Sequence, residues 1–595
     1  GWRMYYQYLT DRGPFNRERI WEPANEDQPA SIIPPVANFT DGPSGLAYYP
    51  GTGFGDTLDD TFLICDFRGG PSNSGIRSFK VQANGATYQL VADDQPIWTC
   101  LATDAAFGPD GALYVSDWVD GWDGLGKARL YRITDPEHEN SPVVAEVKKL
   151  LSDDWASMPV DALAKTLGHA DRRIRLESQW ELAARGDAEA LGEIALDSSA
   201  NPKARLHAVW GLGQITRRPT NVDQGSVEAA KTILIGIMGD MDPTLQAAVL
   251  PIVGEQGWND ATKSVRGLLA SPNARVRYAA IDALGRLQDT ASLEAVINVA
   301  IGGDAQDVAI RHAAAMFLSR AAKSGQIARL VDHENAGARL LAVIALRRQK
   351  SGAVAGFLAD EDPRVVLEAA RAIHDEPIEI AAVALADLIE QPTESDALVR
   401  RLLNANFRIG GAENAVAVAN FSTRAEASEE MRIEALEMLS QWAEPGPLDR
   451  VLGDYRPLEK RDSKLASQAI GPQIDLLMAA PEKVRLKAIE VAAALGIKKI
   501  AGALVQQIGE TGRTSEARGK ALLALASLDP AVAVRLAEKI PADQTRGRLG
   551  LAKLSVMADH AAEKSIDQFI SAISNDDTRI KQKAWDILAL QKDAK

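Results

Sequence analysis

Apolar residues recur at helical spacing through the C-terminal three quarters of the chain. In residues 276–287 they fall at i, i+3, i+4, i+7, i+8 and i+11, which is one face of a helix. Asp or Asn often stands before Pro where such a stretch begins, as in Asp242-Pro243 and Asp362-Pro363. This pair favours a helix start, because the side chain accepts a free backbone N–H and proline fits the first turn. The pattern predicts a series of short amphipathic helices from about residue 151 onward.

These helices form a repeat. Aligned on a basic residue that follows the first apolar position, about twelve or thirteen repeats cover Leu163 to Leu590, mostly about 27 to 35 residues apart. A wide gap before Gln246 and a longer one before Arg485 leave room for an insertion or a degenerate repeat. One helical hairpin cannot bury its apolar face alone, so the repeats must stack. The aligned position holds, in chain order, Arg175, Arg205, Gln246, Arg277, Arg311, Arg339, Val366, Arg400, Arg432, Arg485, Arg518, Arg546 and Lys581.

The motif Asp-Pro-x-Val-Arg at the start of the second helix of a repeat resembles HEAT repeats of the short bacterial kind. The resemblance implies an α-solenoid. It also implies that each repeated arginine pairs with an acidic residue in a turn of the neighbouring repeat, which would build a ladder with a structural role.

The first 150 residues have a different pattern, typical of strands and turns. Residues 61–67 form an apolar run that ends in a Gly-Gly turn, and residues 76–81 alternate in the way that an exposed strand does. Residues 106–118 give a tight turn followed by a strand, and residues 128–133 give the next strand. This segment holds 20 of the 33 aromatic residues, which separates it from the aromatic-poor remainder. We therefore expect two domains: residues 1–150, rich in strands, and residues 151–595, a solenoid.

Composition and charge exclude several classes of function. The formal net charge is −15, and 66 basic residues stand against 81 acidic ones. Nucleic acids and anionic membranes require a basic surface, so neither is an expected partner. No apolar run approaches the length of a membrane span. The two cysteines, Cys65 and Cys100, lie too far apart for a Cys-x-x-Cys-His haem motif, and we expect two buried thiols.

The strand segment resembles a second family. Residues 43–49, 66–70, 108–115 and 116–124 are similar to the last blades of a glucose/sorbosone-dehydrogenase-type β-propeller. With the HEAT repeats that follow, the chain is identified as a member of the membrane-bound dehydrogenase family, whose members are exported bacterial proteins that end in a c-type haem domain. The resemblance implies a mainly α fold, a HEAT solenoid preceded by a partial propeller. It also implies a periplasmic or extracytoplasmic location and a chain that is a fragment, with its haem domain outside it.

The same resemblance bears on a cofactor. Sugar dehydrogenases of this fold bind pyrroloquinoline quinone through cationic residues, and Arg68 matches one of these positions before Gly-Gly. The family's Arg-x-Arg-Asp is replaced by residues 101–104, so that only Asp104 remains. A quinone with three carboxylates needs cations once it is desolvated. We therefore do not expect this quinone to bind, and the family's catalytic histidine would lie in blades that precede this sequence.

One loop carries further candidate chemistry. Asp117, Asp120 and Asp123 are spaced three residues apart, and clustered carboxylates suit Ca²⁺. Trp118 and Trp122 between them are candidates for stacking on a carbohydrate. A solvated acidic loop is the alternative interpretation.

Two functional hypotheses follow. The first is the scaffold and propeller portion of a dehydrogenase-like, haem-associated protein that acts on sugars or alcohols, with this chain inactive by itself. The alternative is a non-catalytic binding scaffold, in which the solenoid groove or the propeller mouth holds a protein or carbohydrate partner. A bilin-lyase-like HEAT protein is a third interpretation, against which the added strand segment counts.

Overall fold

The computed structural model describes residue 18 and residues 32–37, 39–120, 126–217, 222–541 and 544–590. These fall into two compact parts, an N-terminal half that ends at Gln349 and a C-terminal half that begins at Lys350. Strands give way to helices between Ile133 and Pro142, close to the predicted change at residue 150.

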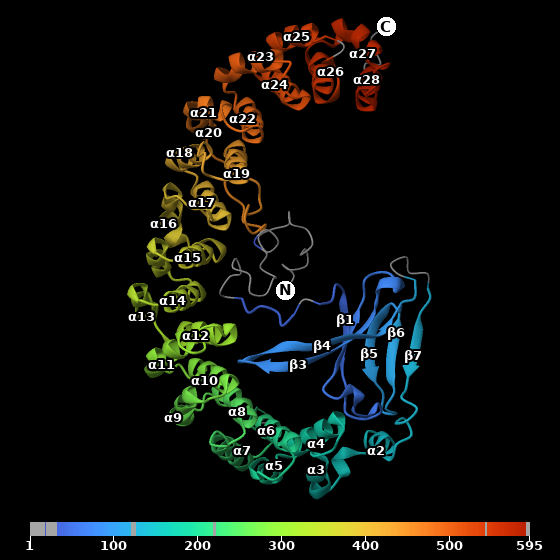
Figure 1. The fold of residues 1–595 in the computed structure, drawn as a ribbon. Coiled ribbons are helices and arrows are strands. Elements are labelled where there is room, and N and C mark those ends of the chain that lie inside the picture. The colour runs from blue at the N-terminus through green and yellow to red at the C-terminus, as the bar shows by residue number, and fades with distance from the viewer. Residues whose placement is uncertain are drawn as a thin grey trace. The chain divides into compact units, whose positions relative to one another are not determined.

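The N-terminal half begins with two antiparallel sheets (Figure 1). In each sheet the strands follow one another in chain order, and each pairs antiparallel with the next. The first sheet contains β1 (Pro43–Tyr48), β2 (Phe62–Asp66), β3 (Gly75–Asn84) and β4 (Thr87–Trp98). The second contains β5 (Ala102–Phe107), β6 (Leu113–Asp117) and β7 (Arg129–Ile133).

The two sheets share one apolar core. Leu63 and Ile76 of the first sheet pack in the same buried cluster as Leu113 and Val115 of the second. Cys65 and Cys100 lie in this cluster as free thiols, which confirms the prediction that they form no bridge. Burial raises the pKa of Cys65 to about 12 and that of Cys100 to about 11, so both thiols stay protonated at neutral pH.

The sheets do not bear out the predicted partial propeller. The described strands form two open sheets, of four and three strands, and these do not close into a ring of blades. The alternating pattern predicted the hairpins correctly, because it reports which residues of a strand face the core. It does not determine how complete sheets assemble, and that part of the prediction was wrong.

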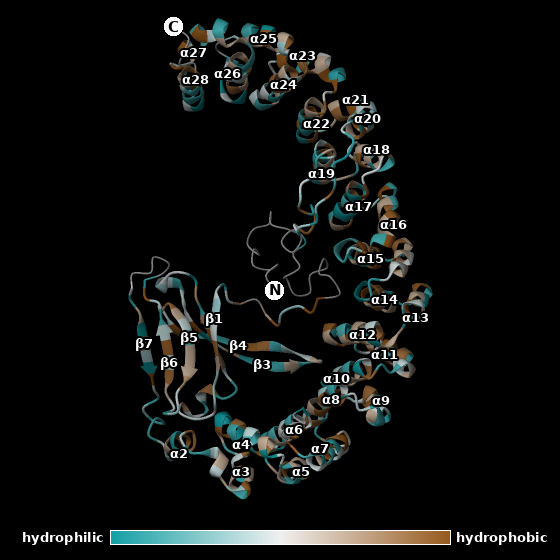
Figure 2. Ribbon diagram, turned by 180° about the vertical axis from the view of Figure 1, so that it is seen from behind, coloured by the Kyte–Doolittle hydropathy of each residue, from teal (hydrophilic) through white to brown (hydrophobic). Residues whose placement is uncertain are grey.

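Helices build the rest of the N-terminal half, and each of them carries apolar and polar residues along its length (Figure 2). They are α2 (Pro142–Leu150), α3 (Val160–Thr166), α4 (Arg172–Arg185), α5 (Ala188–Leu196), α6 (Pro202–Arg217), α7 (Gln224–Ile237), α8 (Pro243–Gln256), α9 (Thr262–Gly267), α10 (Ala274–Arg286), α11 (Leu293–Ile301), α12 (Val308–Ala321), α13 (Ser324–Ala328) and α14 (Ala336–Arg348).

The C-terminal half continues the repeat after the 3₁₀ helix Gly352–Ala359. Its α-helices are α15 (Pro363–Asp375), α16 (Ala382–Asp387), α17 (Asp396–Ile409), α18 (Ala412–Phe421), α19 (Glu429–Ser440), α20 (Lys464–Ile470), α21 (Ile474–Met478), α22 (Glu482–Ala494), α23 (Ala501–Gly509), α24 (Ser515–Leu528), α25 (Pro530–Lys539), α26 (Gly547–Ala561), α27 (Ile566–Ala572) and α28 (Thr578–Leu590).

Local sequence explains where these helices begin and how closely they pack. Asp171, Asp242 and Asp362 each precede a second helix of a repeat and accept a backbone N–H from its first turn. Gly254 and Gly285 lie where successive second helices approach: a Cβ at Gly254 would lie 2.9 Å from the Cα of Ala283, and one at Gly285 would lie 3.0 Å from the Cα of Phe317. Small residues at these contacts let the repeats stack.

One end of the sheets is fixed to the first repeats of the same half. Asp171, the N-cap of α4, is buried and accepts a 2.5 Å hydrogen bond from the Thr52 hydroxyl. It also holds the Arg173 guanidinium, whose Nη1 donates to the carbonyls of Phe107 and Gly108 at 3.0 and 2.8 Å. A single carboxylate therefore caps a solenoid helix and joins it to both sheets.

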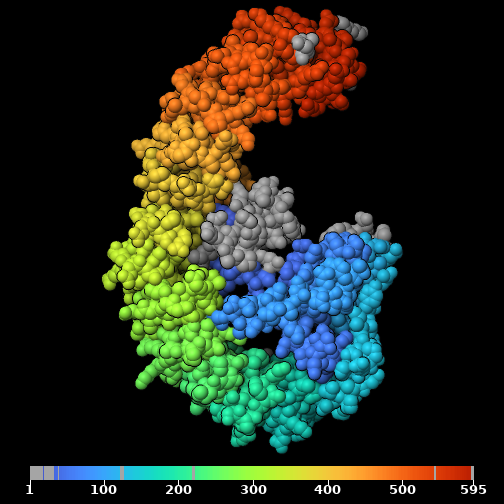
Figure 3. Space-filling view, in the orientation of Figure 1, coloured from blue at the N-terminus to red at the C-terminus, as the bar shows by residue number. Residues whose placement is uncertain are grey.

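The β3–β4 hairpin makes a second contact with the solenoid, visible in Figure 3 where its tip lies against the helices. The backbone N–H of Ala86 donates to Asp307 Oδ2 at 2.7 Å, and Asp307 also caps α12. The Arg275 guanidinium of α10 lies 4.9 Å from the centroid of the Tyr88 ring. Two separate contacts thus hold the sheets on the solenoid.

Candidate functional site

Arg68 and Asp104, the two residues that match quinone-binding positions of the dehydrogenase resemblance, lie in the sheet segment, after β2 and within β5. Arg68 donates to Asp66 Oδ2 at 2.7 Å and pairs with Asp41 at 3.0 Å. Asp104 accepts the N–H of Ala105 at 2.9 Å, and it lies against the backbone of Gly45. Because two carboxylates already neutralise the Arg68 guanidinium, this arrangement does not fit a ligand that carries three carboxylates of its own.

The acidic loop is only partly described, because Asp123 and Trp122 lie outside the described residues. Asp117 is buried and accepts hydrogen bonds from the N–H groups of Leu101 and Val119 and from the Tyr131 hydroxyl. Asp120 forms a 3.0 Å ion pair with Lys127. Among the described residues, no three His, Cys, Asp or Glu side chains are grouped so that they could share a metal ion. Calcium binding in this loop therefore has no support from the two carboxylates that are described.

Trp118 is 45% exposed, and its ring packs edge-on against Phe67 with the centroids 6.4 Å apart. This leaves part of the indole accessible, as carbohydrate stacking requires. Stacking at this residue stays a prediction.

The arginine ladder is present in the solenoid. The fourth residue after the N-cap of a second helix is hereafter called the ladder position. An arginine at this position extends its guanidinium to the end of the preceding helix. Arg277 donates to the carbonyl of Ser271 at 2.6 Å and binds both carboxylate oxygens of Asp304 in the next repeat. Arg205 donates in the same way to the carbonyl of Ala195 at 2.9 Å and to Asp240 at 2.6 Å.

These contacts explain why the position is basic. The last carbonyls of a helix have no partner within that helix and carry partial negative charge, so a cation satisfies them. Arg175 and Arg339 donate to carbonyls five and six residues earlier in the chain. Gln246, which replaces arginine in α8, also donates to two carbonyls, those of Met238 and Asp240. In these repeats the residue at the ladder position therefore acts as an N–H donor to the end of the preceding helix.

Two members of the predicted series differ from this geometry. Arg546 is the N-cap of α26 and not its ladder residue, so the sequence alignment was shifted there. Arg400 stands five residues after the N-cap Ser395, yet it still pairs with Glu430 of the next second helix at 3.0 Å.

Val366 differs from these residues in chemistry, as do Val399 and Gly550 at the ladder positions of α17 and α26. It occupies the ladder position of α15, four residues after the N-cap Asp362, and it has no N–H donor in its side chain. The acidic partner is missing from the next repeat as well. Asp240 and Asp304 stand two and three residues before the N-caps Asp242 and Asp307, whereas Thr393 and Pro392 take these places before Ser395.

An open groove of about 650 Å³ lies at this break in the ladder. Leucines and Val366 form its walls, and three carboxylates stand among its lining residues. Other grooves on the solenoid, such as that beside Ala295 and Val299, lie along the first helices of neighbouring repeats and contain no ladder position. The groove at Val366 (hereafter the Val366 groove) is lined by Ala355, Leu358, Ala359, Asp360, Glu361, Pro363, Val366, Ala384, Asp387, Leu388, Gln391, Pro392, Thr393, Ser395, Leu398 and Leu402.

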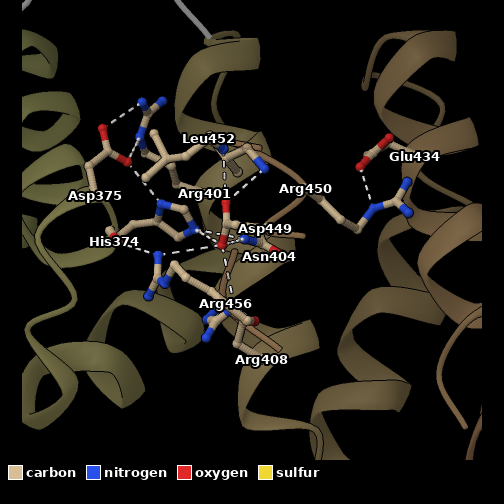
Figure 4. Close-up of polar contacts among 11 residues, drawn as sticks. His374, Asp375, Arg401, Asn404, Arg408, Glu434, Asp449, Arg450, Leu452 and Arg456 are labelled. Carbon is tan, nitrogen blue, oxygen red and sulfur yellow. Dashed lines mark hydrogen bonds and ion pairs between the residues drawn. The ribbon is translucent and has the colours of Figure 1, made fainter. Parts of the chain in front are cut away.

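A buried polar network lies farther along the same helices (Figure 4). The longer gap before Arg485 contains a segment without helix, residues 441–463, which brings Asp449 between α15 and α17. Asp449 is fully shielded and accepts the N–H groups of Val451 and Leu452 at 2.9 Å each. The next residue, Arg450, points to the other side and donates to Glu434 of α19 at 2.8 Å.

His374 is at the centre of this network, with Asp375 on one side and Asp449 on the other. Its Nδ1 lies 2.8 Å from Asp375 Oδ1, and its Nε2 lies 2.7 Å from the amide nitrogen of Asn404, which also donates to Asp449. Burial opposes a charge on His374, but its hydrogen bond to Asp375 and the nearby charge of Asp449 outweigh this and raise its pKa. Arg401 completes the cluster by binding both oxygens of Asp375. These groups are occupied with one another, which gives the cluster a structural role.

Another buried histidine provides a test of pH dependence in the N-terminal half. His207 of α6 lies 2.7 Å from Gln179, and burial together with the positive Arg175 and Arg172 lowers its pKa from 6.5 to about 4. A lowered pKa means that the unfolded chain takes up a proton first as the pH falls. The contribution of His207 is therefore complete above pH 6.5, and we expect about 3 kcal/mol of stability to be lost between pH 6.5 and 4. Urea unfolding across this range measures the loss.

The variant His207→Gln should flatten that pH profile, whereas His560→Gln, a change at an exposed histidine, should leave it unchanged. If the stability of His207→Gln still falls as steeply between pH 6.5 and 4 as that of the wild type, another group is responsible for the pH dependence.

Comparison with known proteins identifies the repeats. The family model of HEAT repeats matches residues 230–319, and no curated protein matches the chain. The structure is similar to importin β, at 12% identity and a TM-score of 0.36 over 75% of this chain and 69% of that one. It is also similar to Kap121p, at 11% identity and a TM-score of 0.38 over 72% of this chain and 48% of that one. The complex of CpcE and CpcF of phycocyanin lyase from Nostoc sp. is 20% identical with a TM-score of 0.20, over 43% of this chain and 87% of that one.

Residues 230–319 are HEAT repeats, and the chain forms a HEAT-type α-solenoid. The resemblance to the membrane-bound dehydrogenase family is corrected by these findings. The family model that matches is that of the HEAT repeats, and the described strands form two open sheets and no closed propeller. The short strand motifs, with their Gly and Asp turns, are typical of many antiparallel sheets, which explains why they misled. None of the helices in the described residues has the length and apolar character needed to cross a membrane.

Proposed function

We propose that this chain is a non-catalytic scaffold that binds a protein partner through its solenoid, with the Val366 groove as the binding site. The observation that supports this proposal is the groove itself: a break in the ladder leaves an apolar-walled space between two stacked repeats. Grooves of this volume accommodate several side chains of a bound segment.

The surface beside the groove supports the same function. Ile380 is 86% exposed and Val383 is 60% exposed, and both lie on the first-helix segment of the repeat that forms one wall. Exposed apolar side chains next to a groove lose contact with water when a partner covers them. The strong polar clusters described above, by contrast, are engaged in joining elements of the fold.

A random peptide library displayed on phage tests the proposal, with the purified full chain as bait. Peptides should be enriched on the wild-type chain and lost on Val366→Arg, in which an arginine of the chain itself fills the groove. Leu476→Arg adds the same charge at an exposed position of α21 and should retain the peptides. Enrichment of the same peptides on all three chains, or of none on the wild type, would refute the groove as the binding site.

A further inference from the structure

The first helix of the repeat that follows α15 exposes apolar side chains to solvent. This segment, residues 379–390, consists of α16 and a 3₁₀ turn at each end. Ile380 is 86% exposed and Val383 is 60% exposed. The first helices α7 and α11 instead expose charged residues such as Glu228 and Glu294, as a solvated helix surface normally does. The exposed side of residues 379–390 (hereafter the α16 face) is therefore a contact surface rather than an ordinary outer face.

The apolar surface continues on both sides of the α16 face. On one side Ile380 packs on Gly352 of the preceding first helix, where a Cβ would lie 2.5 Å from Ile380 Cγ2. The residues that this preceding helix exposes are alanines and a glycine. On the other side a groove of about 300 Å³ lies along α18, and Val416 in its wall is 45% exposed. Figure 1 shows α16 and α18 in one layer of the solenoid, with α15, α17 and α19 in the other.

The charge around this surface is acidic. Residues 372–399 contain no lysine and no arginine. Asp387 at the end of α16, Glu394 in the following turn and Glu413 of α18 are all exposed. Within the described part of the chain, the side chains of these three residues form no ion pair and no hydrogen bond. A basic partner would therefore gain their charges without having to displace a cation of the chain itself.

The shape and chemistry of the surface favour a helix as the bound element. The Val366 groove lies between residues 355–359 of one first helix and residues 384–388 of the next, so it runs along both helices. A third helix can lay a ridge of side chains into such a groove. An extended segment would press its N–H and C=O groups against apolar walls without partners, whereas a helix bonds these groups within itself.

We propose that the α16 face binds an amphipathic helix of a partner protein. The apolar stripe of that helix covers Ile380 and Val383, and lysine or arginine residues beside the stripe face the carboxylates of Asp387 and Glu413. This inference rests on the proposed function, because the Val366 groove forms one side of the same surface, and it names the chemistry of the partner. An acidic helix with the same apolar stripe is excluded by repulsion between like charges.

Fluorescence anisotropy of labelled peptides tests the inference on the full chain. The probe is a peptide of two copies of Leu-Lys-Lys-Leu-Leu-Lys-Leu with blocked ends, compared with the peptide in which glutamate replaces every lysine. Both peptides carry the same apolar stripe. We expect the lysine peptide to bind at least about tenfold more tightly at low salt, and the difference to shrink as salt is added. Val383→Ser should weaken the lysine peptide roughly fivefold, because less apolar surface is covered.

A charge reversal tests where the peptide binds. In the double variant Asp387→Lys and Glu413→Lys the preference should reverse, so that the glutamate peptide binds more tightly. Lysine is favourable at the C-terminal end of a helix, so the change at Asp387 does not weaken α16. Glu294→Lys makes the same change of charge on α11 and should leave the preference as it is in the wild type.

Three results would overturn the inference: equal binding of the two peptides to the wild-type chain, no saturable binding of the lysine peptide, or an unchanged preference in the double variant. The display library separates this inference from the proposed function. If it yields peptides that need an open groove but carry no basic residues, the inference fails while the proposed function stands.

Discussion

Replacing Asp449 with alanine is expected to lower the free energy of unfolding of the C-terminal half by about 3–5 kcal/mol. The carboxylate is completely shielded, and Arg408 and Arg456 each lie 3.4 Å from its Oδ2. Its removal leaves these two cations facing each other without a counter-charge, and it leaves the N–H groups of Val451 and Leu452 without an acceptor. Burial opposes the charge of Asp449, but the neighbouring His374 and the N–H groups of Leu452 and Val451 lower its pKa well below the usual range. The carboxylate is therefore ionised in the folded protein.

Urea unfolding followed by circular dichroism measures this loss, and hydrogen exchange of α15 and α17 locates it. Glu459→Ala is the matched control, because it removes an exposed carboxylate from the same segment. A loss below about 1 kcal/mol in Asp449→Ala would contradict this expectation, because exposed ion pairs contribute no more than that to stability.

Replacing Asp171 with alanine is expected to cost the N-terminal half about 3 kcal/mol and to loosen the sheets from α4. The variant loses the helix cap, the hydrogen bond from Thr52 and the carboxylate that orients Arg173 toward the carbonyls of Phe107 and Gly108. Burial opposes ionisation of Asp171, but the hydrogen bonds and charge of Arg173 lower its pKa. The substitution should therefore increase the rate of hydrogen exchange more in β1 and β5 than in the helices from α8 onward.

Asp242→Ala provides a matched control for this experiment. Asp242 caps α8 in the same way as Asp171 caps α4, by accepting the N–H of the second residue after it, and that hydrogen bond is exposed. It should cost only about 1 kcal/mol, the usual value of a helix cap. Equal effects of the two changes would show that Asp171 acts as a cap alone.

The solenoid was predictable from the sequence because its determinants are local. Helix caps such as Asp242, the apolar face of residues 276–287 and the arginine at the ladder position all act within one repeat or between neighbours. Repetition makes such a signal strong, and the structure confirmed the ladder pairs of Arg205 and Arg277.

The sheets and the buried network were less predictable, because they depend on contacts distant in sequence. Asp171 meets Thr52 across 119 residues, and Asn404 meets Asp449 across 45. The longer gap before Arg485 left room for an insertion or a degenerate repeat, but no pattern in it shows which helices Asp449 would contact. Val366 was placed in the aligned series by its sequence alone, but only the structure shows that a groove lies beside it.

Hydrogen exchange of the full chain with a peptide taken from the display library tests the central claim most directly. We expect slower exchange within residues 355–402, the span that contains the lining of the Val366 groove, and no change at the intact ladder position of α10. Protection confined to other parts of the chain, or equal protection in wild type and Val366→Arg, would contradict it.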